Sequence, residues 1–456
     1  MLRMVPLPYK GRNAMMPIIT QSSRPRLVLA MLLVVYIFNF VDRQILAILA
    51  APIQQELGLS DRQLGLLGGI AFALLYSTLG VPLAWLADRT SRSRVVTGSL
   101  MLWSGFTALC GLATGFWQIF LARLGVGIGE AGGVAPSYAI ISEYFPPRRR
   151  ALALSVYSLG IPLGSAAGVL AGGYIAARID WRTAFIAVGL AGMLIAPLVR
   201  LIVRDKPRAA PVASKPAFAT VARTLAGKPS FWLLSFGAAS GSMIGYGLAF
   251  WLPSLMRRSF GLDLIATSHF LAGLLLIGGV GGIVAGGWLA DRLGARDRAW
   301  FGYVPAIAYL ISIPLFAGGM HGGDVRIAFA LFLLPQALSY AWLGPVLSAV
   351  QHLVAPPERA TAAALFLLIN NLIGLSGGIY ALGALSDALT PLYGSDALRH
   401  AMLGGLSLYA VAALLVGLAG PHLRRDWGSR SPRRNDVPGE HREDRRTRND
   451  AIDHEG

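Results

Sequence analysis

Long apolar runs are the feature of this 456-residue sequence that most restricts its fold. About a dozen of them approach or exceed the roughly 20 residues that an α-helix needs to cross a hydrocarbon core, and the short segments between them hold nearly all of the charge. The chain is 55% hydrophobic and only 14% charged. Because a soluble core cannot enclose so many runs of this length, the sequence predicts an all-α membrane protein with about twelve transmembrane helices.

The apolar runs and the segments between them also predict how the chain is divided. We expect helices near residues 27–50, 64–87, 95–114, 117–141, 151–177, 182–203, 229–256, 266–290, 299–319, 324–350, 360–386 and 400–420. The parts are then an N-terminal segment (1–26), a six-helix bundle (27–203), a linker (204–228), a second six-helix bundle (229–420) and a tail (421–456). The linker contains Pro and basic residues, and the tail is so polar from Arg424 onward that we expect it to be disordered.

Two short signatures occur once in each half of the chain. The segment Ala84–Arg89 returns as Gly287–Arg292, 203 residues later, and Pro146–Arg149 returns as Pro356–Arg359, 210 residues later. Two different signatures at nearly one offset indicate a duplication of six helices. We therefore expect two pseudo-symmetric bundles that rock about a site near the middle of the membrane.

The basic residues are distributed unevenly between the two ends of the expected helices. With the N-terminus inside, the N-terminal segment and the even-numbered loops hold 21 of the 40 Lys and Arg, the opposite loops hold seven, and the tail adds nine to the inside. This asymmetry predicts that both termini are cytoplasmic in a multi-pass protein of the inner (plasma) membrane. The first 25 residues lack the apolar core and cleavage site of a signal peptide, so we expect the first helix to be retained.

Several classes of protein and site are disfavoured. The formal net charge of +17 would suggest nucleic acid in a soluble protein, but the basic loops explain it here. A single cysteine, Cys110, permits neither an intrachain disulfide nor a cysteine metal cluster. The histidines have no metal-binding spacing, and neither a P-loop nor a nucleophile elbow is present. We expect a monomer that is not an enzyme and has no cofactor, metal or nucleic-acid partner.

The repeated loop segments carry a recognisable pattern. They resemble the loop signature of the major facilitator superfamily, G-x-L-A-D-R-x-G-R-[RK], closely in the second half, whereas the first half departs from it at Ala84 and Ser91. The resemblance implies the major facilitator fold and a cytoplasmic gate in which the acids accept hydrogen bonds across the seam between the halves. The expected members are Asp88, Arg89, Arg92, Arg150, Asp291 and Arg292. The alternative is an ordinary pair of basic loops.

Four charged residues fall inside the apolar spans, with Asp42 and Arg43 in the first and Arg123 and Glu130 in the fourth. A charged side chain that faces lipid costs at least ~2.5 to 3.5 kcal/mol, so all four should face the protein interior and one another. At about 1.5 Å of rise per residue, Asp42 and Arg123 lie at roughly similar depths, about 12 and 9 Å from the outer ends of their helices. Glu130 should lie roughly 10 Å deeper.

This neutral set of charges suggests a coupling mechanism. Protonation of Asp42 or Glu130 would change the freedom of Arg43 and Arg123 to bind an anion, with Asn39 beside them, and would couple a proton to the substrate. The alternative is a fixed ion-pair network that only joins the first helix to the fourth.

Polar and aromatic side chains of the second half are candidates for the opposite wall of the cavity. They are Tyr246, Phe250 and Trp251 in the seventh helix, Tyr340 and Trp342 in the tenth, and Asn370 and Asn371 in the eleventh. A largely apolar wall opposite a charged one would suit an amphiphile, with its phosphate or carboxylate on the arginines and its hydrocarbon on the far side. Core or interface packing is the alternative for each aromatic.

The runs Asn39–Gln44, Ser60–Leu67 and Gly127–Ala131, with Glu143–Pro147 downstream, resemble the spinster-like branch of the superfamily. The resemblance implies proton-linked export of lysolipid-like amphiphiles, including phosphorylated sphingoid bases in animal relatives. It also implies that the residues matching Asp42, Arg43, Arg123 and Glu130 carry substrate or proton. Organic-anion/proton symporters share a similar Asp-Arg in the first helix and Gly-Glu-Ala in the fourth, so they remain an alternative.

The expected function is therefore secondary active transport of an anionic amphiphile by alternating access, with protons and the bilayer as partners. A membrane sensor that uses the same scaffold without transport is the competing class.

Overall fold

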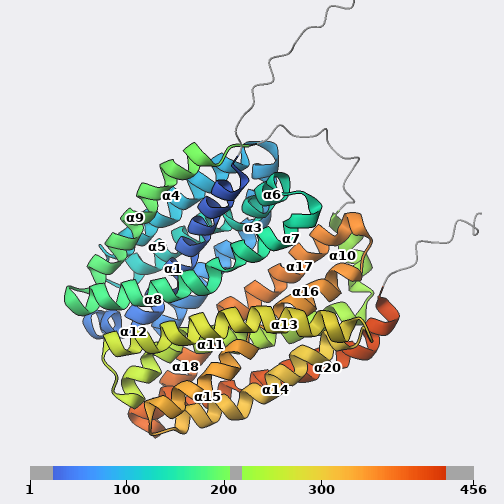
Figure 1. Ribbon diagram of the computed structural model, residues 1–456. Helices are drawn as coiled ribbons and strands as arrows, with labels where there is room; N and C mark the ends of the chain where they lie inside the picture. Colours follow the sequence, from blue (N-terminus) through green and yellow to red (C-terminus); the bar gives the residue numbers. More distant parts are fainter. Residues whose placement is uncertain (1–23, 206–217, 428–456) are drawn as a thin grey trace, which may run out of the picture.

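A computed structural model describes residues 24–205 and 218–427, and its elements are all helical (Figure 1). The first half contains α1 (Pro25–Leu57), α2 (Asp61–Gly65), η1 (Leu66–Ile70), α3 (Ala71–Arg89), α4 (Arg92–Cys110), α5 (Phe116–Ala131), α6 (Val134–Tyr144), α7 (Pro147–Ser158), α8 (Gly160–Arg178) and α9 (Trp181–Ile202). The second half contains α10 (Phe218–Ala226), α11 (Pro229–Phe260), α12 (Leu264–Gly273), η2 (Leu274–Gly278), α13 (Gly279–Gly294), α14 (Trp300–His321), α15 (Val325–Leu338), α16 (Leu343–His352), η3 (Pro356–Glu358), α17 (Arg359–Asn370), η4 (Asn371–Leu375), α18 (Ser376–Tyr393), η5 (Gly394–Asp396), α19 (Ala397–Gly405) and α20 (Ser407–Asp426).

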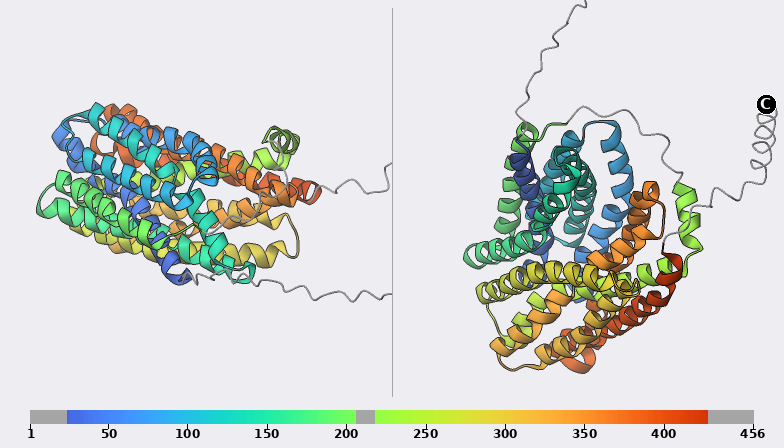
Figure 2. Two further views of the ribbon diagram at one scale, coloured as in Figure 1. Left: turned by 90° about the horizontal axis from the view of Figure 1, so that it is seen from above. Right: turned by 45° about the vertical axis from the view of Figure 1, so that its right-hand side comes forward.

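The two halves form two bundles. Figures 1 and 2 show α1 to α9 grouped on one side and α11 to α20 on the other. Ten segments of the described chain are long and apolar enough to cross a membrane. The expected twelve helices correspond to these ten and α4, with the last segment, 359–426, counted as two helices that meet at Gly394.

The duplication is visible in the turns between helices. α1 ends at Gly58 and α11 ends at Gly261, and both glycines have left-handed backbones with φ of 62° and 66°. Each glycine is followed two residues later by an N-cap, Ser60 or Asp263, whose side chain accepts a hydrogen bond from a backbone N–H of the next helix. These matching residues are 203 positions apart, which is also the offset of the loop signature.

π-Helical turns interrupt helices at matching places in the two halves. η1 follows α2 and η2 follows α12, and the two turns begin 208 residues apart. Several expected helices are also split, at Gly132–Gly133 in the fourth and at Leu159 in the fifth. Such irregular turns are often found at functional sites, because they change the direction in which side chains point.

The halves meet through several elements of each bundle. α2 and η1 pack against α18, α8 packs against α12 and η2, and α1 packs against α11. Small residues permit this approach: a Cβ atom at Gly69 would lie 2.7 Å from the Ser376 carbonyl oxygen, and one at Gly383 would overlap the Asp61 carbonyl oxygen.

Two expected boundaries need correction. The predicted linker, 204–228, contains helix α10, because Val221 and Leu225 are fully buried and the helix packs against α17. The predicted tail, 421–456, begins as helix: α20 continues to Asp426, and the ring of Trp427 lies 4.9 Å from that of Phe301. The remaining predictions, of an N-terminal segment, a linker and a disordered tail, concern residues 1–23, 206–217 and 428–456, which lie outside the described residues.

Candidate functional site

Two neighbouring cavities lie between the halves. The larger, of about 170 Å³, is lined by α1, α8, α11, α15, α16, α17, η4 and the turn 339–342. The smaller, of about 60 Å³, is lined by α1, η1, α3, α5, α11, η4 and α18. Both cavities are lined by Phe40, Gln44, Tyr246 and Ala249, so they form adjoining parts of one site.

Arg43 and Glu130 form the ion pair of this site. Arg43 Nε donates to Glu130 Oε2 at 2.9 Å, from α1 to α5. The Glu130 side chain is fully buried, whereas that of Arg43 is 14% exposed and lines the smaller cavity. A charge-assisted pair with one partner at a cavity can be opened by a ligand or by a proton.

Phe72 contacts both arginines. Its ring centroid is 4.9 Å from the Arg43 guanidinium carbon and 5.1 Å from that of Arg123. Both cations therefore make cation–π contacts with one ring, and Arg43 makes further ones with Phe40 and Tyr76. Arg123 also lines the smaller cavity, and no acid among the described residues pairs with it within 4.0 Å. Two guanidinium groups thus line the smaller cavity, and one of them, that of Arg43, is paired with the buried carboxylate of Glu130.

Asp42 and Asn39 lie behind this wall. Asp42 is 1% exposed and Asn39 2%, and neither is among the residues that line the two cavities. Thr107 and Trp103 are beside the Asp42 carboxyl, yet its oxygens make no hydrogen bond of normal geometry to a described residue. Asp42 is therefore a buried acid one residue away from the arginine that faces the cavity.

The second half supplies the opposite wall much as expected. Tyr246 lines both cavities, Phe250 the smaller, and Asn370 and Asn371 the larger. Trp251 differs, because its fully buried indole N–H donates to the Ile379 carbonyl at 2.9 Å within the second bundle. Asn39 and Trp251 thus do not line the cavity in this conformation. The sequence did not indicate Phe72 or Gln44 as site residues, because the residues that line the cavity beside them come from other helices.

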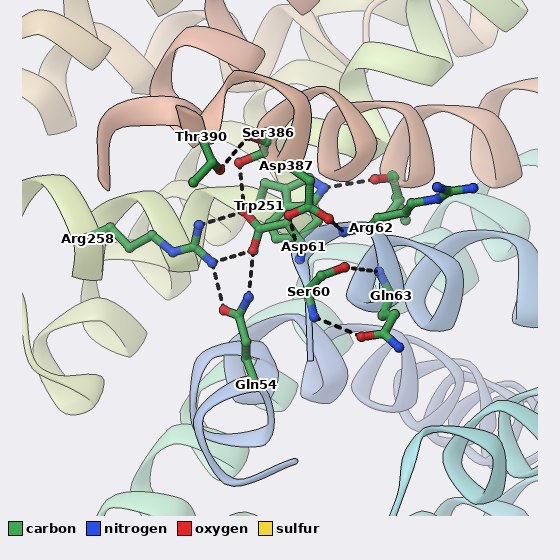
Figure 3. Close-up of polar contacts among 11 residues, drawn as sticks. Gln54, Ser60, Asp61, Arg62, Gln63, Trp251, Arg258, Ser386, Asp387 and Thr390 are labelled. Carbon is green, nitrogen blue, oxygen red and sulfur yellow. Dashed lines mark hydrogen bonds and ion pairs between the residues drawn. The ribbon is translucent and has the colours of Figure 1, made fainter. Parts of the chain in front are cut away.

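A polar cluster joins the halves at the end of the bundle where α1 ends, and we call it the Asp61 latch (Figure 3). It consists of Gln54, Asp61, Arg258, Ser386 and Asp387. Arg258 donates to both Asp61 oxygens at 2.6 and 2.7 Å, and Ser386 Oγ and Gln54 Nε2 donate to the same carboxylate at 2.6 and 2.8 Å. Asp387 accepts the backbone N–H groups of Asp61 and Arg62 at 3.0 and 2.9 Å.

Other polar contacts between the halves lie at this end as well. Arg62 Nε donates to the Tyr380 hydroxyl at 3.2 Å, and the Tyr174 hydroxyl hydrogen-bonds His269 Nε2 at 2.8 Å. The latch could not be predicted from the sequence, because Asp61 and Arg258 lie at helix ends, where charged side chains are common. Only the fold brings them together.

The expected cytoplasmic gate lies at the opposite end. Arg92 pairs with Asp88 at 2.7 Å and with Glu143, and Arg150 donates to the Ser142 carbonyl at 2.8 Å. The remaining members stack instead: Arg89 lies over Trp85 and Arg292 over Trp288, while the side chain of Asp291 is outside the described residues. The contacts described for Arg89, Arg92, Arg150 and Arg292 stay within their own half, whereas the Asp61 latch joins the two halves at the other end.

Within residues 24–205 and 218–427, no group of three or more His, Cys, Asp or Glu side chains could hold a metal ion.

Comparison with known proteins identifies the family. Residues 32–378 match the sequence model of the Major Facilitator Superfamily. An "MFS-type efflux pump" of Mycolicibacterium smegmatis is 36% identical over 399 residues, which cover 85% of this chain and 91% of the pump. Human "Protein spinster homolog 1" is 28% identical over 392 residues, 80% of this chain and 74% of that protein.

Solved structures agree with this assignment. A bacterial homologue of the human lysosomal transporter spinster, crystallised in an inward-facing and unoccupied conformation, aligns with a TM-score of 0.81 and 29% identity, over 89% of this chain and 99% of the homologue. Its inward-facing and occupied conformation aligns with a TM-score of 0.76. The chain belongs to the major facilitator superfamily and is a transporter of the spinster type.

Proposed function

We propose that this transporter moves an anionic amphiphile, of the lysophospholipid or sphingoid-phosphate kind, through the site between its halves. The observation that carries the proposal is the pair of arginines on the cavity wall. Arg43 is matched by Glu130, whereas Arg123 has no ion-pair partner within 4.0 Å among the described acids. A guanidinium that faces a cavity without a direct ion pair, between apolar and aromatic side chains, favours a phosphate or carboxylate over a neutral or cationic ligand.

Proton coupling is the second part of the proposal. Protonation of Glu130 would remove the charge that holds Arg43, and the freed guanidinium could then bind the substrate anion. Asp42 is placed to share this role, because it is buried, interacts electrostatically with Glu130 and Arg123, and has no normal hydrogen bond to its carboxyl oxygens. Proton and substrate anion would then be exchanged at one cluster.

The third part concerns orientation and direction. With both termini in the cytoplasm, as the basic loops favour, the Asp61 latch closes the outer end of the bundle in an inner (plasma) membrane. This arrangement corresponds to an inward-facing state, like that of the aligned spinster homologue. The name of the Mycolicibacterium relative, an efflux pump, favours export.

Proteoliposomes containing the purified transporter and a labelled lysophosphatidic acid test the proposal. We expect substrate flux that is accompanied by a pH change in a lightly buffered lumen. Arg123→Ala should abolish binding of the anionic lipid, and Asp42→Asn with Glu130→Gln should uncouple flux from the pH gradient. Equal binding of a neutral analogue to the wild type would overturn the anion assignment, and unchanged coupled flux in the double variant would overturn the proton assignment.

Asp297→Asn is the matched control for the acid substitutions. The Arg424 side chain and the backbone N–H of Ala299 both donate to the Asp297 carboxylate and lower its pKa to about 2. A lowered pKa means that this carboxylate becomes protonated only in strong acid, so it stays ionised across the range in which transport is measured. Its removal should therefore leave the pH dependence of flux between about pH 5 and 8 unchanged.

A further inference from the structure

The larger cavity has a wall of neutral hydrogen-bonding groups. The second half contributes side-chain amides and hydroxyls to it: Ser242, Tyr246, Gln336, Ser339, Tyr340, Asn370 and Asn371. No charged side chain lines this cavity among the described residues, since Arg43 and Arg123 face its smaller neighbour. The cavity thus combines these hydrogen-bonding groups with apolar side chains such as Phe40, Ile161 and Leu367.

A short chain of hydrogen bonds fixes two of these amides. Ser242 Oγ donates to Asn370 Oδ1 at 2.9 Å, and Asn370 Nδ2 approaches Asn371 Oδ1 at 3.5 Å. Asn370 is only 2% exposed, so its orientation is set by Ser242, whereas Asn371 is partly exposed. The contact to Asn371 is long for a hydrogen bond, so the Asn371 amide keeps its capacity to donate and to accept for a ligand.

The backbone explains why two successive asparagines can line one cavity. Asn370 ends α17 and Asn371 begins the π-helical turn η4. A π turn departs from the regular rotation of an α-helix and is often retained at functional sites. The amides therefore lie where the helix is irregular, opposite Gln44 of α1, which lines both cavities.

Apolar side chains such as Ile161 and Leu367 also line this cavity, so a hydrocarbon chain can occupy that part of it. Against Asn371, a hydrocarbon chain would displace water from the amide without replacing its hydrogen bonds. A ligand with a hydroxyl or amide group would replace them. Since Gln44 and Tyr246 border both cavities, an anion near Arg43 and a neutral polar group near Asn371 can belong to one molecule.

We propose that Asn370 and Asn371, held by Ser242, form a subsite for a neutral hydroxyl of the substrate, next to the site for its anion. The inference rests on the proposed function and narrows it: the substrate class is a hydroxyl-bearing anionic lipid, such as a monoacyl glycerophosphate. Analogues whose hydroxyl is absent or blocked are disfavoured, because they leave the amides unpaired.

Binding of two matched probes to the full-length purified transporter tests this subsite. One probe is lysophosphatidic acid with its free glycerol hydroxyl, and the other is the same lipid with that hydroxyl methylated. We expect the wild type to bind the free hydroxyl about tenfold more tightly or better. Asn371→Leu should reduce this preference to near one, while Asn371→Gln, which keeps the amide, should retain part of it.

Two further variants separate recognition from folding. Ser242→Ala leaves both amides in place and frees Asn370, so it should weaken the preference even if Asn371→Leu does not fold. Ser235→Ala, a buried hydroxyl of the same helix that does not line the cavity, should leave the preference unchanged. Equal binding of both probes to the wild type would overturn the subsite while leaving the anion site intact. Failure of both probes to bind would overturn the anion site and the subsite together.

Discussion

At the scale of residues, the site depends on one aromatic ring that contacts two cations. Phe72 is 1% exposed and contacts both Arg43 and Arg123, so one ring stabilises two cations through its π face. The four charged residues were predictable from the sequence, because charge inside an apolar span stands out. The role of Phe72 was not predictable, because one phenylalanine among many apolar residues has no distinguishing pattern in the sequence. Only the fold brings its ring next to both arginines.

Phe72→Leu should therefore weaken binding of an anionic lipid. Each cation–π contact contributes roughly 0.5 to 2 kcal/mol depending on solvation, so we expect about a 2- to 30-fold loss of affinity as the guanidinium groups lose their common support. Isothermal titration with lysophosphatidic acid measures the loss. The control is Phe185→Leu, a fully buried ring of the same half that packs edge-on against Trp181 instead of a cation. Equal loss in both variants would assign the effect to general packing.

At the scale of elements, glycines set how closely α8 approaches α1. A Cβ atom at Gly164 would overlap the Ile37 carbonyl oxygen and would lie 2.8 Å from Phe40 Cβ. The other face of Phe40 borders both cavities, so this packing also positions the site. The sequence predicted the helices from their apolar runs. It did not predict the breaks at Gly132–Gly133 and Leu159 or the π turns, because these depend on contacts between helices and not on local composition.

Gly164→Ala should destabilise the first bundle. The added methyl forces α8 away from α1, and overpacking of this kind costs about 1 to 3 kcal/mol. We expect a lower melting temperature in detergent than that of the wild type. Gly98→Ala is the matched control, since a Cβ atom there meets nothing within 4 Å and alanine favours the helix. A melting temperature for Gly164→Ala as high as that of Gly98→Ala would contradict the close packing.

At the scale of the whole molecule, the polar bridges between the halves gather at one end. The repeat and the two-bundle architecture followed from the sequence, because signatures recurred at nearly one offset. The conformation, in which the two halves are joined at one end, could not be predicted from the sequence. It depends on the Asp61 latch, whose members come from α1, α2, α11 and α18. Removing the charge of Asp61 should favour opening at this end.

The measurement that tests this account most directly is the distance between the two halves at the latch end. It is obtained from spin labels at Ala177 and Ser395 on a Cys110→Ala background. We expect Asp61→Asn to raise the population of longer distances roughly 10- to 100-fold, because a hydrogen bond to a charged group contributes about 1.5 to 3 kcal/mol. Glu56→Gln is the control, since it breaks an ion pair with Arg182 inside one half at the same end. It should leave the population of longer distances unchanged. Lysophosphatidic acid should shift the distances of the wild type, whereas one unchanged distance in every variant, with and without the lipid, would contradict alternating access about this site.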